Sequence, residues 1–292
     1  MTARRYVGRF APSPSGPLHF GSLVAALASF LDARSQNGRW LLRMDDLDTR
    51  ARDRTAEQIL RDLEKLHLEW DGPVIYQSRR IDLYAASFKA LMDSRCLYPC
   101  ACSRKTVGER YNGRCAGGLG PGQVARSWRL RIASDSEIAF HDRIQGTFKQ
   151  NVHDAVGDFI VRRADGPFAY QLTTVVDDAE CSVTDVVRGA DLLDNVPRQM
   201  YLQQCLNLAR LAYAHVPIAT DIEGRKLSKS EGAAALNMNA PEMEIWRAFS
   251  FLGHQPPSEL EGAGVGALLA WGRSAWSTAR IRQSKMMNAG AE

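Results

Sequence analysis

Hydrophobic residues in the first third of the chain change between two spacings. Short apolar runs are typical of strands, whereas apolar residues that recur every three or four positions are typical of helices. In chain order, the expected elements lie at 6–10, 18–31, 39–44, 56–68, 74–76 and 81–92. Strands and helices that alternate in this way predict an α/β fold built on a parallel sheet.

The alternation is interrupted after residue 95. We therefore predict an inserted α+β subdomain over 96–180, between a first segment at 1–95 and a second at 181–235 that completes the sheet. The β-like runs of the insertion, which turn signals separate, lie at 128–132, 144–148, 159–161 and 170–176.

The second half of the chain returns to longer elements and ends in a short helical region at 236–292. The expected elements are a strand at 183–187, a helix at 196–211, a strand at 215–219, a polar loop at 221–235, helices within 241–281 and a frayed end at 283–292.

Composition narrows the class of protein. Hydrophobic residues make up 45% of the 292 positions, which is enough for a sizeable core. Because no apolar run approaches the roughly 20 residues of a membrane helix and the N-terminus lacks an apolar signal core, we expect a cytoplasmic protein without a membrane partner. We also expect a monomer. The net charge of +4 permits an anionic partner but does not require one.

Four of the six cysteines, Cys96, Cys100, Cys102 and Cys115, lie in one stretch. Clustered thiols in a reducing compartment favour a metal over disulfides. A structural zinc ion takes four ligands, and by composition Cys96 is the obvious fourth. Buried thiols without a metal are the alternative.

The proline-rich loop at 11–17, between the first strand and the first helix, is a potential anion site. Backbone N–H groups and the positive end of the helix dipole face such a loop. Here the helix starts with His19, Gly21 and Ser22. His19 can donate to phosphate oxygens, and the missing side chain of Gly21 lets an adenine ring lie against the backbone. Taken alone, this motif is better explained as a capped helix with a surface histidine.

A second polar motif follows about two hundred residues later, at 226–230. Its Lys226, Ser228 and Lys229 predict a basic loop that can close over a triphosphate and stabilise the leaving pyrophosphate. Taken alone, it is better explained as a solvated surface loop. The chain contains neither a G-x-x-x-x-G-K-[ST] loop nor a G-x-G-x-x-G motif.

Together, the two motifs resemble the paired ATP signatures of class I aminoacyl-tRNA synthetases. The stretch at 8–22, Trp70-Asp71, Gln77-Ser78 and the stretch at 187–191 are similar to the glutamyl and glutaminyl branch, and the resemblance covers about 4–235. It implies a Rossmann-like sheet and activation of an amino acid with ATP and Mg²⁺. The residues that it places on ATP are His19, Gly21, Ser22, Lys226, Ser228 and Lys229, of which His19, Lys226 and Lys229 are catalytic.

Glutamate carries two carboxylates and one ammonium group, so its site needs cationic donors and an anionic group. Arg9 and Arg188 stand at strand ends, where open parallel sheets bind ligands, and Tyr170 can offer its phenol. Without the resemblance, each arginine is better explained by a surface ion pair. The resemblance assigns to glutamate Arg9, Phe10, Ala11, Pro12, Ser13, Asp45, Tyr170 and Arg188.

Asp45 departs from the pattern of this branch, which typically has glutamate at this position. The shorter side chain keeps the charge that would face the substrate ammonium, but its reach is in question. Alternatively, the aspartates at 45–48 start the following helix.

For the cysteine stretch, the resemblance implies that zinc is held by Cys100, Cys102, Tyr111 and Cys115 in an acceptor-type subdomain. Cys96 is then an ordinary small apolar residue.

The chain ends about sixty residues after the lysine motif, which leaves room for a few helices but not for an anticodon-binding domain. In this respect it resembles the glutamyl-Q tRNA(Asp) synthetases, which attach glutamate to queuosine at the wobble position of tRNA(Asp). Two alternatives are a truncated glutamyl-tRNA synthetase that charges a tRNA 3′ end and a non-catalytic glutamate- or tRNA-binding paralogue. The intact His19 and lysines argue against the latter.

Overall fold

The computed structural model describes residues 5–47, 51, 53–103, 106–107, 110–227 and 235–289. The first three strands, β1 (Val7–Phe10), β2 (Arg39–Met44) and β3 (Ile75–Tyr76), form a parallel sheet in the order β1-β2-β3. The sequence therefore predicted all three strands and their parallel arrangement.

A second sheet has the order β7-β6-β10-β9, in which β9 (Asp185–Gly189) and β10 (Ala212–Val216) are parallel. The antiparallel hairpin of β6 (Glu137–Asp142) and β7 (Gly146–Asn151) lies at its edge. Thr184 N–H, just before β9, donates to the Val7 carbonyl oxygen over 2.8 Å. Since this bond places β9 beside β1, the carboxyl ends of β1, β9 and β10 face one region.

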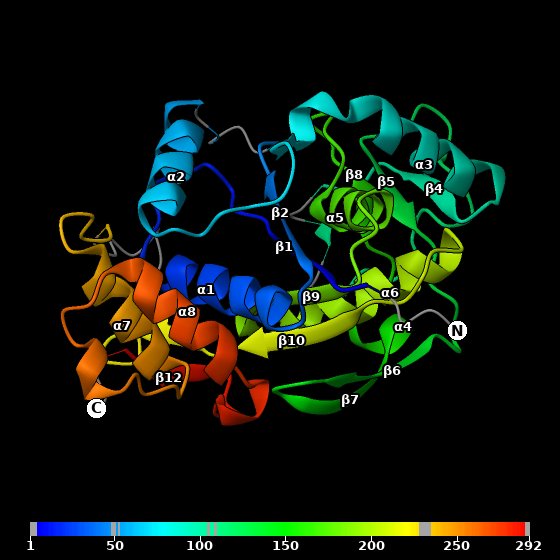
Figure 1. Ribbon diagram of the computed structural model, residues 1–292. Coiled ribbons are helices and arrows are strands. Elements are labelled where there is room, and N and C mark those ends of the chain that lie inside the picture. Colours follow the sequence, from blue (N-terminus) through cyan, green and yellow to red (C-terminus); the bar gives the residue numbers. More distant parts are fainter. Residues whose placement is uncertain are drawn as a thin grey trace.

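Helix α1 (Phe20–Ser35) packs on β1, β9, α7 (Pro241–Phe251) and α8 (Val265–Ala275), as Figure 1 shows. Its apolar residues are buried on nearly every side, because the sheet covers one face and the C-terminal helices cover the other. A Cβ on Gly272 would lie 2.3 Å from the Phe249 ring, so glycine is required where α8 approaches α7.

A separate antiparallel sheet, β4 (Leu97–Cys100), β5 (Ser127–Leu130) and β8 (Ile160–Arg162), lies with α3 (Ile81–Asp93) at the upper right of Figure 1. The remaining elements are α2 (Asp53–Lys65), α4 (Val152–Ala155), α5 (Tyr170–Glu180), α6 (Val196–Cys205), β11 (Ile218–Thr220), β12 (Met286–Asn288) and 3₁₀ turns at Gln77–Arg79, Ala190–Asn195, Ser258–Leu260 and Thr278–Arg280.

The β-like run predicted at 170–176 is wrong, because these residues begin helix α5. Thr173, Thr174, Val175 and Val176 are β-branched and favour a strand locally. In the folded protein all four are buried, and α5 packs against α3 and α6. Tertiary packing therefore outweighs the local preference.

Three further predictions are corrected at element ends. Pro217, which lacks an N–H donor, divides the strand predicted at 215–219 into β10 and β11. The helix predicted over 196–211 ends at Cys205, just before Asn207 with its φ of +53°. Within the segment expected to be frayed, β12 pairs in parallel with β11.

Strand β6 was not predicted, because it buries only alternate residues such as Ile138 and therefore lacks an apolar run. The predicted domain boundaries stay a prediction. Strand β6 lies in the predicted insertion at 96–180, yet it pairs with β10 of the predicted segment at 181–235. Among the described residues, no helix has both the length and the apolar character to cross a membrane.

Candidate active site

A cavity of about 390 Å³ lies at the carboxyl ends of β1, β9 and β10. It is lined by the loop after β1, the first turn of α1, the residues after β9 and the connection from β10 to β11. Lys226 and Leu227 close its side. His19, Gly21 and Ser22 of the first predicted ATP motif and Lys226 of the second, which are far apart in the sequence, therefore line one cavity.

His19 is the N-cap of α1, and its Nδ1 accepts a hydrogen bond from Ser22 N–H over 3.3 Å. A Cβ on Gly21 would lie 3.3 Å from the His19 ring and 3.5 Å from the Leu227 carbonyl oxygen. A glycine at this position therefore keeps the wall of the cavity open between the histidine and the lysine segment.

Lys226 Nζ lies 2.6 Å from a carboxylate oxygen of Asp191, and both side chains are 38% exposed. The backbone around Lys226 is anchored, because Leu227 N–H donates to the Ala219 carbonyl oxygen over 2.8 Å. The chain is described again from Ala235, which forms an antiparallel bridge with His19. The predicted ATP ligands Ser228 and Lys229 lie outside the described residues.

Arg9 and Arg43 enter a buried cluster of charges at the ends of β1 and β2. Arg43 Nη1 lies 2.6 Å from Asp178 Oδ1, which is also 3.3 Å from Arg9 Nε, and Arg43 Nε lies 2.7 Å from Asp45 Oδ1. Burial tends to raise the pKa of Asp178, but Arg9 and Arg43 outweigh it and lower the pKa. Burial raises the pKa of Asp45 despite Arg43.

The structure corrects the alternative that Asp45 and Asp46 start the helix that follows them. Helix α2 starts at Asp53, so neither aspartate begins it. Asp45 pairs with Arg43, and Asp46 accepts hydrogen bonds from the Ser78 amide over 2.8 Å and the Ser78 hydroxyl over 2.6 Å.

Asp177 is fully buried and joins α5 to the segment after β3. Its carboxylate accepts hydrogen bonds from Gln77 Nε2 over 2.8 Å, Arg80 Nε over 2.7 Å and the Tyr84 hydroxyl over 2.8 Å. Gln77-Ser78, one of the motifs that carried the resemblance, thus holds the wall of the site by hydrogen bonds.

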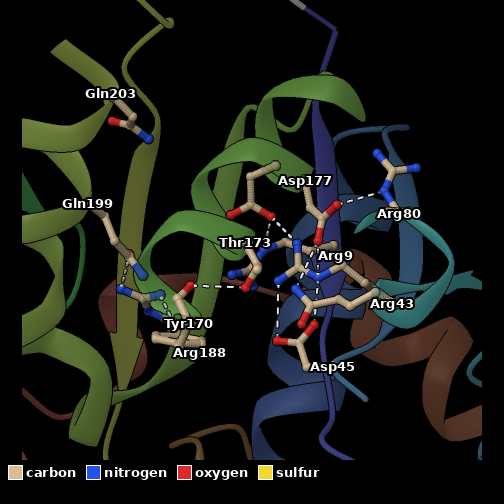
Figure 2. A network of polar contacts seen from close by, with 12 residues as sticks. Arg9, Arg43, Asp45, Arg80, Tyr170, Thr173, Asp177, Arg188, Gln199 and Gln203 are labelled. Carbon is tan, nitrogen blue, oxygen red and sulfur yellow. Dashed lines mark hydrogen bonds and ion pairs between the residues drawn. The ribbon is translucent and has the colours of Figure 1, made fainter. Parts of the chain in front are cut away.

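Arg188 occupies the other side of the site, as Figure 2 shows. Its Nη1 donates to the Tyr170 hydroxyl over 3.3 Å, its Nη2 to Gln199 Oε1 over 2.9 Å and its Nε to His215 Nε2 over 3.0 Å. Arg188 is 5% exposed, whereas Tyr170 is 38% exposed.

The structure thus brings together the residues predicted for glutamate. Phe10, Ala11, Pro12 and Ser13 line the cavity. Arg9 and Asp45 lie on one side of the polar network drawn in Figure 2, and Tyr170 and Arg188 lie on the other. The explanation of the two arginines as surface ion pairs is wrong, because Arg9 is 4% exposed and Arg188 5%.

The sequence analysis missed Arg43, Asp177, Asp178 and His215. The sequence did contain a sign of these residues, namely charged residues within or next to apolar runs. Arg43 interrupts a buried strand, and the two aspartates follow a run of valine and threonine. A charged residue at a buried position needs a partner.

A larger cavity, of about 530 Å³, lies elsewhere. It is lined by the starts of β1 and β9, including Val7 and Thr184, and thus lies at the amino ends of these strands. Ligands of open parallel sheets bind at the carboxyl ends, so we place the active site in the smaller cavity.

The cysteine cluster lies apart from both cavities. The sulfur atoms of Cys100, Cys102 and Cys115 lie within 4.8 Å of one another, and the Tyr111 hydroxyl is 3.4 Å from Cys100 Sγ and 3.8 Å from Cys102 Sγ. Cys96 is not in this group and packs near Cys205 instead.

Arg129 Nε donates to Cys100 Sγ over 3.3 Å. Burial tends to raise the pKa of Cys100, but hydrogen bonds from Tyr111 and Arg129 outweigh it and lower the pKa to about 7. The thiolate, which is the form that binds metals, is therefore favoured at this position.

Comparisons with known proteins agree with this geometry. A family model described as tRNA synthetases class I (E and Q), catalytic domain, matches residues 6–115 and 122–258. Over 295 residues the chain is 49% identical to the glutamyl-Q tRNA(Asp) synthetase of Dechloromonas aromatica, covering 97% of this chain and 98% of the relative. Over 286 residues it is 52% identical to the protein of the same name from Thiobacillus denitrificans, with coverage of 94% and 95%.

Solved structures show the same fold. A glutamate tRNA ligase from Elizabethkingia meningosepticum in complex with its amino acid superimposes with a TM-score of 0.83 at 23% identity, covering 98% of this chain and 67% of that one. The glutamate-tRNA synthetase of Elizabethkingia anophelis gives a TM-score of 0.81 at 23% identity, with coverage of 96% and 67%.

Proposed function

Because the chain belongs to the glutamyl-Q tRNA(Asp) synthetases, a family of class I ligases, we propose that it activates L-glutamate with ATP and transfers the glutamyl group to queuosine in tRNA(Asp). The observation that carries this proposal is the joint cavity of the two ATP motifs beside the buried arginines.

In the first step, His19 and Lys226 bind the phosphates of ATP, which class I synthetases use together with Mg²⁺. Lys229, outside the described residues, completes this role. An oxygen of the glutamate α-carboxylate attacks the α-phosphorus in line, and the bond to the pyrophosphate breaks. Lys226 then stabilises charge on the leaving group, after exchanging Asp191 for a phosphate.

Arg9, Arg188 and Tyr170 bind the carboxylates of glutamate, and Asp45 faces its ammonium group. Arg43 donates a short hydrogen bond of 2.7 Å to Asp45 Oδ1 and a long one of 3.4 Å to Asp45 Oδ2. The second oxygen can therefore still bind the substrate ammonium group. Because these groups are already together in the protein alone, activation does not require tRNA.

In the second step, a hydroxyl of the queuosine ring attacks the glutamyl carbonyl. An ester bond forms and AMP leaves. A wobble base in an anticodon loop is accessible to such a site, because loop bases can be splayed out of the stack. The names of the relatives support this acceptor.

The acceptor is tested with labelled glutamate, ATP and two forms of tRNA(Asp). Labelling should persist on tRNA(Asp) trimmed of its 3′ adenosine and vanish on tRNA(Asp) made without queuosine. The opposite pattern would show a synthetase that charges the 3′ end.

We further propose that Cys100, Cys102, Tyr111 and Cys115 hold one structural zinc ion. Three sulfur atoms and a phenol oxygen that converge on one point fit a tetrahedral ion. Bound zinc would join the end of β4 to the loop that follows it.

Elemental analysis of freshly purified protein should find one zinc per chain. Cys102→Ser should lose the metal, whereas the matched Cys96→Ala variant should keep it. Protein without zinc, or zinc lost with Cys96, would reject this ligand set.

A further inference from the structure

A chain of buried hydrogen bonds runs behind the proposed glutamate site, from β6 to the partly exposed side chain of Tyr170. Asp142 Oδ2 lies 2.6 Å from His215 Nδ1, and His215 Nε2 lies 3.0 Å from Arg188 Nε. Arg188 Nη1 in turn donates to the Tyr170 hydroxyl, a contact shown in Figure 2. Asp142 and His215 are 0% exposed, so water does not compete for these bonds.

The protonation of His215 follows from its two neighbours. Arg188 Nε can only donate, so His215 Nε2 must be the acceptor and the ring hydrogen must be on Nδ1, where it donates to Asp142. The ring is therefore neutral. Burial lowers the pKa of His215, Arg188 and Arg9 lower it further, and Asp142 acts in the opposite direction.

This arrangement determines what Arg188 can offer a ligand. A guanidinium group has five N–H hydrogens. Described acceptors engage four of them: His215 at Nε, Gln199 and the Leu192 carbonyl at Nη2, and Tyr170 at Nη1. The second Nη1 hydrogen belongs to the same nitrogen that donates to Tyr170. In that bond the Tyr170 oxygen is the acceptor, so the bond does not use the hydrogen of the Tyr170 hydroxyl.

We propose that His215 is a positioning residue for glutamate recognition. By accepting from Arg188 Nε, it orients the guanidinium so that one Nη1 hydrogen and the Tyr170 hydroxyl together bind one carboxylate of the substrate. Asp142 acts one step further back, by holding the tautomer of the imidazole. This inference rests on the proposed binding of glutamate.

A substitution at Asp142 tests the tautomer without removing the ring. Asp142 Oδ1 accepts from the backbone N–H groups of Ile144, Gln145 and His215 over 2.9–3.1 Å. In Asp142→Asn, these three donors hold the amide oxygen in place, so the amide nitrogen faces His215 Nδ1. The ring must then carry its hydrogen on Nε2, where it opposes the Nε hydrogen of Arg188.

The measurement is glutamate-dependent pyrophosphate exchange without tRNA. Asp142→Asn should raise the KM for glutamate about tenfold or more, the scale of one lost hydrogen bond to a charged group. The KM for ATP should change less than about threefold, because none of the hydrogen bonds of Asp142, His215 and Arg188 involves a described residue of the ATP motifs.

His215→Gln provides the rescue. The glutamine oxygen can accept from Arg188 whichever residue occupies position 142. His215→Gln should therefore raise the glutamate KM less than Asp142→Asn does, and the double variant should resemble His215→Gln alone. If the two residues merely support the fold, the defects add and both KM values rise.

The outcomes are distinct. Wild-type protein without glutamate-dependent exchange overturns the proposed function. Wild-type exchange with an unchanged glutamate KM in Asp142→Asn overturns this inference alone, as do additive defects in the double variant. Thermal melting of each variant checks that it folds, and if Asp142→Asn does not, His215→Asn tests the same bond, because its shorter side chain cannot reach Arg188.

Discussion

The two groups of charges around the active site differ in their exposure to solvent. The side chains of Arg9, Arg43 and Asp178 expose 3–5% of their surface and share their partners. Lys226 and Asp191 each expose 38% and pair only at the edge of the cavity. An exposed ion pair contributes about 0–1 kcal/mol, so it exchanges partners easily. In the proposed function, the amino acid therefore meets a preformed site, whereas the phosphates of ATP meet contacts that can be remade.

Substituting the lysines should separate activity from stability most strongly. Lys226→Ala or Lys229→Ala should lower glutamate-dependent pyrophosphate exchange by about 10²-fold or more, the scale for losing one transition-state donor. The free energy of unfolding should change by less than about 1 kcal/mol. The matched control is Arg225→Ala, which removes a neighbouring exposed charge. Near-normal exchange in the lysine variants would reject their role on phosphate.

Removing a charge from the buried group should, unlike the lysine substitutions, lower the stability of the fold strongly. Arg43→Ala leaves Asp45 and Asp178 without their shortest ion pairs, which are 2.7 and 2.6 Å long. We expect a loss of about 3–5 kcal/mol in the free energy of unfolding, measured by denaturant titration. Lys89→Ala removes an exposed partner of Asp93 and should cost under about 1 kcal/mol. Equal losses would contradict the comparison.

Within the buried group, Asp45 is proposed to bind the substrate as well as Arg43, and the two roles can be separated by kinetics. Asp45→Ala should mainly raise the KM for glutamate in the exchange reaction, because the substrate ammonium loses its counter-charge. Glutamine, which lacks the second carboxylate, should be activated at least about tenfold less efficiently, on the scale of one charged hydrogen bond. An unchanged glutamate KM would leave Asp45 as a partner of Arg43 alone, and comparable activation of glutamine would refute the roles of Arg9 and Arg188.

The smallest expected effect concerns acid sensitivity. Since burial lowers the pKa of His215 in the folded state, the unfolded chain takes up the proton first as the pH falls below about 6.5. Wild-type stability should therefore decrease from pH 7 to pH 5, by at most about 1.4 kcal/mol per pH unit for this group. His215→Gln should decrease less steeply. His254, whose pKa burial also lowers, contributes equally to both proteins. Parallel curves would show that His215 does not titrate in this range.

Much of the site was predictable because its residues lie at strand ends. Arg9 and Arg188 follow from the strand pattern and the motifs, and both belong to the polar network drawn in Figure 2. The partners that hold them were not predictable from spacing. Arg43 and Asp178 are 135 positions apart, and Asp142 and His215 are 73 apart. Nothing local in the sequence encodes such pairs.

Two of the errors in secondary structure share one cause. A strand was predicted where α5 begins because its residues are β-branched, and the pairing of β12 was missed because its partner lies far away in the sequence. In both cases the environment that determines the conformation comes from distant elements. For the fourth residue of the cysteine cluster, composition indicated Cys96. Only the family resemblance placed Tyr111 among the thiols, where the structure has it.

The parallel pairing of distant strands has a consequence for synthesis on the ribosome. Strand β1 cannot pair with the segment before β9 until Thr184 has been made, and β11 remains unpaired along one edge until β12 follows. The cavity at the carboxyl ends of β1, β9 and β10 therefore forms only after most of the chain has been made, and the edges of the earlier strands stay unpaired until then. Nascent chains of this protein should depend on protection from aggregation until the last strand is translated.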